Sequence, residues 1–199
     1  MVAKLASRLW QKGIVISLAI SVLATFSLVG QGLYMQGKAV VAQFLLEQAW
    51  QKQKKKNLLG IKPWSWADMY PVAELQMTPL NQSFVVANTD SGQALAFAPG
   101  LNGMSDNNLH VISAHNDTHF RRLGELKVGD ELELTLFEAE QFIAKQFTVI
   151  NIDVFDIEQH QLVVDSSNNT TQQLILITCF PFANHSQTTT QRLVITAVE

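Results

Sequence analysis

The segment LILITCF, residues 174–180, reads as a β-strand that is apolar on both faces and ends at a cysteine. Because both faces of such a strand must be covered, we expect it in the interior of a sheet. Cys179 is the only cysteine of the 199-residue chain. It is either a small apolar residue buried in a core or a reactive thiol kept for chemistry, and composition alone leaves both interpretations open.

Further strand-like segments surround this one. Short runs of Val, Ile, Leu and Phe are separated by Asn, Asp, Gly and Ser, which is the pattern of strands joined by turns. The predicted strands are 83–88, 93–99, 109–114, 130–137, 141–156, 172–178 and 192–198. Seven or eight short strands without long helical patterns between them predict an all-β domain, either an antiparallel barrel or a sandwich.

The N-terminal part has a different composition. Residues 14–29 carry no charge, and the apolar stretch extends to Met35, which is about the length that crosses a bilayer. That length favours an uncleaved transmembrane helix over a signal peptide, whose apolar core is usually about 7–15 residues. Basic residues precede it at Lys4, Arg8 and Lys12. They predict a cytoplasmic N-terminus and an exported C-terminal domain, although the lysine run within 51–57 favours the opposite orientation.

We therefore expect three parts: a cytoplasmic N-terminus and membrane anchor over 1–37, a stalk and lead-in segment over 38–71, and a β-domain over 72–199. The segment 38–56 has helix-forming composition. Its apolar side is expected at Val41, Phe44, Leu45 and Ala49. The following IKPWSWADMYP, 61–71, contains two prolines and two tryptophans and predicts an extended segment over the domain surface.

Charge and cysteine content exclude some classes of function. The net charge of −3 does not mark the chain as a nucleic-acid-binding protein. One cysteine, with no closely spaced set of metal ligands, predicts that the chain has no zinc site. We expect no metal and no cofactor.

The strand pattern predicts a site around the cysteine. If 172–178 and 192–198 form one hairpin, Cys179 lies opposite Arg192, whose charge would favour the thiolate. A cysteine nucleophile also needs a proton donor and acceptor, normally histidine. His115 ends the strand LHVISA, 109–114, and alternation places it on the same face as Ser113.

The other histidines are weaker candidates. His185 lies close to Cys179 along the chain and is the local rival, although an exposed and idle histidine is the commoner case in such a loop. His110 faces the opposite side of its strand from His115. No geometric argument supports His119 or His160, and we interpret His110, His119 and His160 as structural or solvated.

Three segments carry a resemblance to a known family. LILITCF at 174–180 resembles the T-L-x-T-C strand of sortases, VISAHNDTHF at 111–120 resembles their G-H-x-D-T-x-F histidine segment, and RLVITA at 192–197 resembles their closing arginine strand. Their order and separation also fit. KPWSWADMYPVAEL at 62–75 resembles the lead-in of a proteobacterial subgroup.

The resemblance implies an eight-stranded sortase-type β-barrel with short helices and a cysteine transpeptidase. Such enzymes cut an LPxTG-like C-terminal sorting signal of an exported protein, hold the acyl chain as a thioester, and pass it to an amine acceptor. By resemblance Cys179 is the nucleophile, His115 the general acid/base, and Arg192 the group that positions substrate or stabilises the oxyanion. Asp117 and Thr178 match the loop aspartate and the threonine before the cysteine, as second-shell or substrate-binding residues.

Together these inferences predict a single-pass protein of the inner (cytoplasmic) membrane whose catalytic domain faces the periplasm or exterior. Two alternatives stay open. The first is a cysteine hydrolase that uses water as the acceptor, because the choice of acceptor depends on water exclusion and on a second binding groove. The second is a non-catalytic envelope domain that binds a partner and buries Cys179.

Overall fold

The structure is a computed structural model, which describes residues 17–18, 21–22, 25, 30, 37–105, 108–158, 171–182 and 189–199. The chain separates into two compact units, 1–41 and 42–199. The predicted membrane-spanning stretch lies mostly outside the described residues, and no helix within them is long and apolar enough to cross a bilayer. The anchor and its orientation therefore stay predictions.

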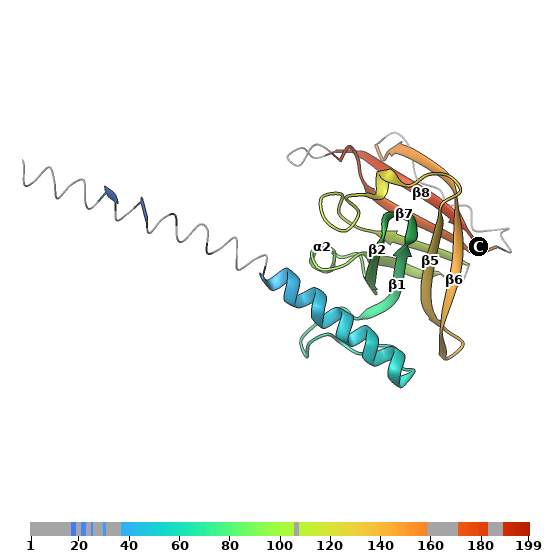
Figure 1. The fold of residues 1–199 in the computed structure, drawn as a ribbon, viewed down its shortest axis with the longest axis horizontal. Coiled ribbons are helices and arrows are strands. Elements are labelled where there is room, and N and C mark those ends of the chain that lie inside the picture. Colours follow the sequence, from blue (N-terminus) through green and yellow to red (C-terminus); the bar gives the residue numbers. More distant parts are fainter. Residues whose placement is uncertain are drawn as a thin grey trace, which may run out of the picture. The chain divides into compact units, whose positions relative to one another are not determined.

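Within the described residues, eight strands close into a barrel (Figure 1). The strands are β1 (Pro71–Met77), β2 (Gln82–Ala87), β3 (Gly100–Ser105), β4 (Leu109–Ser113), β5 (Glu131–Glu138), β6 (Gln141–Asp156), β7 (Gln173–Cys179) and β8 (Gln191–Val198). Around the barrel their order is β1-β2-β3-β4-β7-β8-β6-β5. Strand β7 thus lies between β4, to which it is parallel, and β8, to which it is antiparallel. The predicted eight-stranded barrel is confirmed.

Six of the predicted strands are confirmed, with their ends shifted by at most one residue. The predicted strand at 93–99 is wrong, because helix α2 (Gly92–Leu95) and a turn occupy this segment. Its alanines favour a helix, and Ala94 and Ala98, one helical turn apart, are both buried. Strands β1 and β3 were not predicted. In β1 the residues AELQM alternate between buried and half-buried, but all five are strong helix formers and Glu74 and Gln76 are weak strand formers, so composition concealed the strand.

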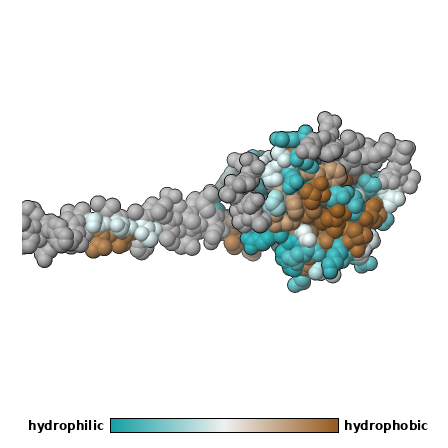
Figure 2. All heavy atoms as spheres, turned by 90° about the horizontal axis from the view of Figure 1, so that it is seen from above, coloured by the Kyte–Doolittle hydropathy of each residue, from teal (hydrophilic) through white to brown (hydrophobic). Residues whose placement is uncertain are grey.

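Apolar side chains fill the inside of the barrel. All eight strands contribute buried members to this core: Leu75, Met77, Val86, Leu101, Ile112, Leu132, Leu134, Phe147, Leu174, Leu176 and Ile195. Two short 3₁₀ turns, η1 (Thr78–Leu80) and η2 (Leu123–Glu125), add the buried Leu80 and Leu123. Because the interior is a packed core, the polar side chains of the strands face outward or lie at the barrel ends. Figure 2 shows that apolar residues also gather on one outer face, among hydrophilic ones.

A helix spans residues 37–56 and packs against the barrel from Ala42 onward. Its buried side chains follow the 3.6-residue helical period: Ala42, Leu46, Ala49, Trp50 and Gln53. The predicted apolar side is confirmed at Ala49, which is buried, and is wrong at Val41 and Phe44, which are 56% and 60% exposed. Helix residues from Ala42 on belong to the compact unit of the barrel, whereas the sequence predicted a separate stalk over 38–56.

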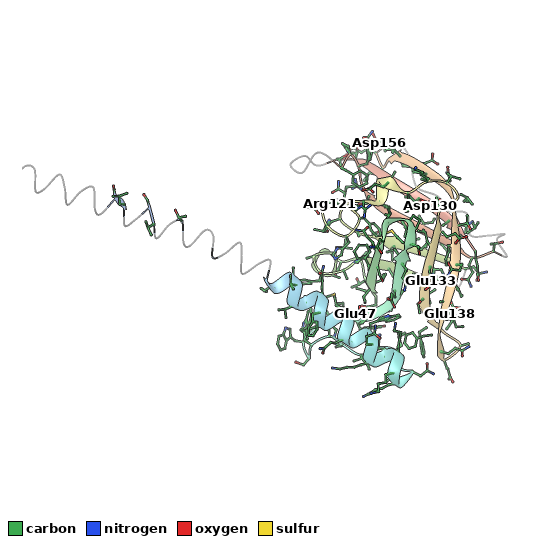
Figure 3. The ribbon with its side chains drawn as sticks, in the orientation of Figure 1. Glu47, Arg121, Asp130, Glu133, Glu138 and Asp156 are labelled. Atoms are coloured by element: carbon green, nitrogen blue, oxygen red, sulfur yellow. The ribbon has the colours of Figure 1, made fainter. Side chains whose placement is uncertain are left out.

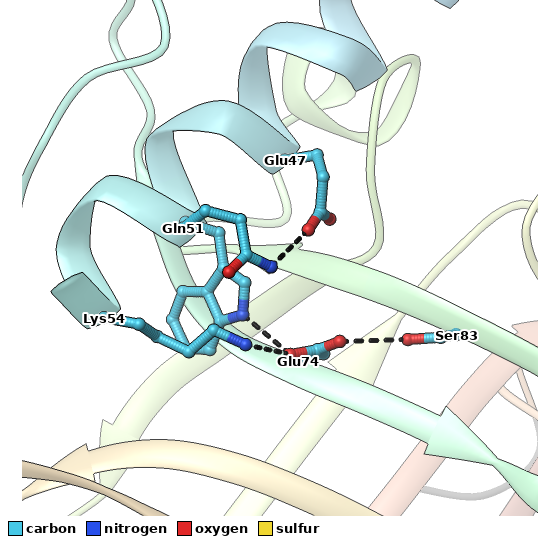
Figure 4. A network of polar contacts seen from close by, with 6 residues as sticks. Glu47, Gln51, Lys54, Glu74 and Ser83 are labelled. Atoms are coloured by element: carbon cyan, nitrogen blue, oxygen red, sulfur yellow. Dashed lines mark hydrogen bonds and ion pairs between the residues drawn. The ribbon is translucent and has the colours of Figure 1, made fainter.

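Trp50 and Glu74 connect this helix to the barrel wall (Figure 4). The buried Trp50 indole packs edge-on against Phe142 and donates from Nε1 to Glu74 Oε2 at 2.8 Å. Lys54 donates to the same oxygen at 3.0 Å, and Ser83 on β2 donates to Oε1 at 3.3 Å. Burial by itself raises the pKa of Glu74, but these donors outweigh it and hold the pKa below its ordinary value. Glu74 is therefore ionised in the folded protein near neutral pH.

Gln53 organises the segment that leads from the helix into β1. Its Nε2 donates to Pro71 O at 2.9 Å, and its Oε1 accepts from the main-chain N–H groups of Gly60 and Ile61. Further along, Trp64 packs edge-on against Phe97 beside α2. Residues 57–70 form no regular helix or strand, which agrees with the predicted irregular segment over 61–71 except that Pro71 begins β1.

Candidate active site

Cys179 is the last residue of β7, and Arg192 lies opposite it on β8. Phe180 N donates to Gln191 O at 3.1 Å, which makes Phe180–Gln191 a hydrogen-bonded pair. The neighbouring Cys179–Arg192 pair is therefore of the non-hydrogen-bonded type, in which Cβ atoms approach to about 4.5–5.5 Å. The predicted cross-strand pairing is confirmed, and it places the residue that carries the thiol opposite the residue that carries the guanidinium.

His115 approaches Cys179 from the other side. The last pair of the parallel β4–β7 ladder is Ser113↔Ile177, and Ala114 N donates to Ile177 O at 3.2 Å beyond it. His115 lies two residues after Ser113, and Cys179 lies two residues after Ile177. Adjacent strands are about 4.8 Å apart, so this register, extended by two residues beyond the last pair, places His115 next to Cys179 at one edge of the barrel.

Side-chain alternation places these three residues on the outer face. Their neighbours Ala114, Thr178 and Leu193 are 5%, 2% and 4% exposed and face the core. The alternate residues therefore point outward: His115 is exposed, whereas Cys179 and Arg192 are half-buried. The result is a row His115–Cys179–Arg192 on the outside of a packed barrel, with His115 two residues beyond β4, Cys179 at the end of β7 and Arg192 on β8.

Thr178 lies beneath this row, in contact with the core. Its Oγ1 donates to Ala114 O at 2.7 Å, and both groups are buried. The resemblance assigned Thr178 to the second shell or to substrate binding. The structure places its hydroxyl on the inner side, where it joins the residue before Cys179 to the residue before His115.

The guanidinium of Arg192 is oriented by the main chain. Its Nη1 donates to Thr189 O and Gln191 O, both at 2.8 Å. Thr189 in turn donates from Oγ1 to Phe180 O at 2.6 Å. Nη1 carries two of the five guanidinium donors, and within the part of the chain that the structure describes no hydrogen bond is made by the other three, on Nε and Nη2.

The loop after His115 is held by several turns. Phe120 N donates to His115 O at 3.1 Å, and the Phe120 ring is fully buried. Arg121, labelled in Figure 3, donates from Nε and Nη2 to Asp117 O at 3.1 and 3.0 Å. Asp117 thus contributes its carbonyl to the loop, and its exposed side chain lies two residues beyond His115.

The other described histidines are buried. His110 faces the core at 8% exposure and lies 3.4 Å from Gln172 Oε1 through Nε2. His119 packs edge-on against Phe84, and its Nε2 lies 3.1 Å from Gln43 Nε2. Burial lowers the pKa of both imidazoles, which favours the neutral form. Both fit the predicted structural role. His160 and the rival His185 lie outside the described residues.

Two contacts near the row were missed by sequence reasoning. Asn116 donates from Nδ2 to Pro181 O at 3.2 Å, and a Cβ on Gly124 would lie 2.7 Å from Cε2 of Phe182. Both join the loop after β4 to the loop after β7. No local pattern signals them, because each contact depends on how β4 and β7 pair. Among the described residues, no group of three or more His, Cys, Asp or Glu is placed to hold a metal ion.

The arrangement fits covalent chemistry. Residues with an imidazole and a guanidinium flank the cysteine, so the row contains the nucleophile, the proton carrier and the anion-stabilising group that acyl transfer requires. Its outward position lets a peptide reach the thiol without entering the core.

Comparisons with known proteins agree with this fold. The family model of the sortase domain matches residues 75–199. The chain is 35% identical over 78 residues to Sortase D of Bacillus subtilis, an alignment that covers 39% of this chain and 36% of that relative. The chain thus spans about a third of the length of this curated relative.

Solved structures with the same fold include two sortases. The Clostridium perfringens Sortase D5 transpeptidase has a TM-score of 0.56 at 20% identity, covering 80% of this chain and 98% of that one. Sortase A from Corynebacterium diphtheriae has a TM-score of 0.55 at 18% identity, covering 85% and 90%. At these identities the likeness concerns the fold.

Proposed function

This chain belongs to the sortase family, and from that premise we propose that it is a membrane-anchored cysteine transpeptidase. Its substrate is an exported protein with an LPxTG-like C-terminal sorting signal, and its acceptor is an amine. The observation that supports the proposal is the row His115–Cys179–Arg192, formed by the ends of β7 and β8 and the residue that follows β4 by two positions, at one edge of the outer face. A buried structural cysteine would need neither an outward position nor these two neighbours.

The first half-reaction forms a thioester. The Cys179 sulfur, as thiolate, attacks the carbonyl carbon of the threonine in the sorting signal, and negative charge develops on the carbonyl oxygen. Arg192 donates to that oxygen, since donors aimed at developing charge stabilise the transition state. When the intermediate collapses, the Thr–Gly C–N bond breaks and protonated His115 gives its proton to the departing amine.

The second half-reaction reverses these roles. The amine acceptor attacks the thioester carbonyl, the C–S bond breaks, and neutral His115 takes the proton that the attacking nitrogen loses. The products are a new amide bond and the Cys179 thiolate. Water in place of the amine would give a carboxylic acid, so the product identifies which acceptor was used.

Location and subgroup complete the proposal. The uncharged stretch at 14–35 supports a single-pass anchor in the inner membrane with the barrel on the periplasmic or exterior side. The segment 62–75 supports membership of the subgroup found in proteobacteria. A reporter fused after Glu199 tests the orientation, since activity confined to the cytoplasm would refute it.

The test of activity uses an LPxTG-type peptide and an amine, with the amide product measured by mass spectrometry. Cys179→Ala and His115→Ala should each abolish turnover without unfolding the protein. Arg192→Ala should lose about 10²–10³ in turnover, the usual cost of one oxyanion donor. Arg192→Lys should recover only part of it, because lysine lacks the planar fork of donors. A hydrolysed product that stays unchanged when the amine is added would favour the hydrolase instead.

A further inference from the structure

We propose that Asn116 is a positioning residue whose side-chain amide ties the loop after His115 to the loop after Cys179. Through this tie it fixes the separation and orientation of the imidazole and the thiol. The inference rests on the proposed function, since it takes His115 and Cys179 as the reacting pair.

The tie lies where the main-chain ladder between β4 and β7 ends. The last paired residues are Ser113 and Ile177, and one further bond runs from Ala114 N to Ile177 O. His115 is therefore beyond the ladder that sets the spacing of the two strands. Asn116 follows it immediately and donates from Nδ2 to Pro181 O at 3.2 Å.

A second tie acts from the inner side. Thr178 donates to Ala114 O at 2.7 Å, so the residue before His115 is bonded to the residue before Cys179. Asn116 bonds the residue after His115 to the second residue after Cys179. One tie alone would leave the loop free to pivot about it. With both, the backbone of His115 is held on either side against the chain that carries Cys179.

Packing supports the same pair of loops farther from the row. Gly124 in η2 lies against the Phe182 ring so closely that a Cβ would sit 2.7 Å from it. Phe182 also packs edge-on against Phe180, with ring centroids 6.1 Å apart. These contacts bring the loops together, and the Asn116 bond sets their register beside the reacting groups.

The energetics separate a positioning role from a structural one. A single half-buried hydrogen bond adds little to the stability of a domain, because water replaces it in the unfolded chain. Geometry is far more sensitive, since a displacement of about 1 Å between reacting groups can cost about 10²-fold in rate. Loss of the Asn116 donor should therefore lower turnover strongly while the protein stays folded.

Two variants test the tie in the purified full chain. Asn116→Asp keeps the shape of the side chain but, when ionised, offers no donor to Pro181 O; Asn116→Ala removes the donor without adding charge. Both should lower kcat about 10- to 100-fold, with KM within about twofold of wild type and an unchanged melting temperature. Gln146→Leu is the matched control, because its exposed amide bonds Glu133 on the β5–β6 wall, and its kcat and KM should match wild type.

Alkylation of Cys179 by iodoacetamide provides a readout that does not need turnover. The site of alkylation is unambiguous, because the chain has a single cysteine. Wild type should react faster than His115→Ala, and Asn116→Ala should be slowed toward the His115→Ala rate.

The outcomes separate the two proposals. If wild type turns over peptide and both Asn116 variants keep kcat within twofold, the tie is refuted and the proposed function stands. If wild type shows no turnover with any LPxTG-type peptide, the proposed function fails. Alkylation then still decides the tie: equal rates for wild type and Asn116→Ala refute it, and a slowed variant supports it.

Discussion

Replacing Thr178 by valine removes one buried hydrogen bond beneath the candidate active site and leaves the shape of the side chain almost unchanged. Thr178 is 2% exposed, and its hydroxyl donates to Ala114 O at 2.7 Å. Without this donor, the end of β4 loses its inner connection to β7. His115 is the next residue, so we expect Thr178→Val to affect both stability and turnover.

The size of the stability effect follows from the burial. Leaving a buried carbonyl without its donor costs about 1–3 kcal/mol, and the added methyl group of valine offsets part of it. A net loss of about 1–2 kcal/mol corresponds to about 2–8 °C in Tm for a domain of this size. Thr178→Ser keeps the hydroxyl but deletes a buried methyl group, which costs about 1 kcal/mol by itself. The two variants therefore lose similar stability for different reasons.

Turnover separates them. If the bond to Ala114 holds His115 in place, Thr178→Val should lower kcat about tenfold or more, while Thr178→Ser stays within about twofold of wild type. Thermal unfolding and peptide turnover, measured on wild type and both variants, give the two quantities. A serine variant that loses as much kcat as the valine variant would refute the reasoning, because the hydroxyl would then not be the group that matters.

Three further perturbations have expected outcomes. Burial lowers the pKa of His119 below its ordinary 6.5, so the unfolded chain binds a proton more readily than the folded protein. The free energy of unfolding should therefore be constant with respect to this group above about pH 6.5 and decrease as the pH falls below that value. The decrease should be less steep in His119→Gln, as denaturation at several pH values would show. Equal slopes would contradict this. Gly124→Ala should lower kcat several-fold with little change in Tm, because its Cβ would lie 2.7 Å from the Phe182 ring; unchanged kcat would mean that the ring moves freely. Trp50→Phe should cost about 1.5–3 kcal/mol in urea unfolding through its lost bond to the Glu74 carboxylate, and a loss below 0.5 kcal/mol, about the noise of such measurements, would show that this bond is dispensable.

Local chemistry determined much of this protein. The alternation and apolar runs of β5, β6, β7 and β8 specify strands, because successive side chains of a strand point to opposite faces of the sheet and only one face is buried in the core. The same pattern locates Cys179 and Arg192 at facing ends of a hairpin, and it predicts His115 on the outward side just after its strand, which ends at Ser113. Each of these inferences needs only neighbours along the chain or a single antiparallel connection.

Only the tertiary structure decided which surface of each element is covered. The helix at 37–56 has apolar residues on more than one side, and the barrel selects the side of Leu46 and Trp50 while Phe44 stays exposed. For the same reason β1 was missed and 93–99 was misassigned. Their side chains satisfy a strand or a helix about equally well until a neighbouring surface favours one.

The immediate surroundings of the reacting pair depend on the longest-range contact. Strands β4 and β7 are parallel neighbours, and the bonds Thr178–Ala114 and Asn116–Pro181 join residues 64 and 65 positions apart. Parallel pairing leaves no turn or hairpin signal in the sequence, since its two strands are joined by a long crossover. The sequence by itself therefore determined which residues carry the proposed chemistry, whereas the way His115 is held against Cys179 was decided only when β4 and β7 paired in the closed barrel.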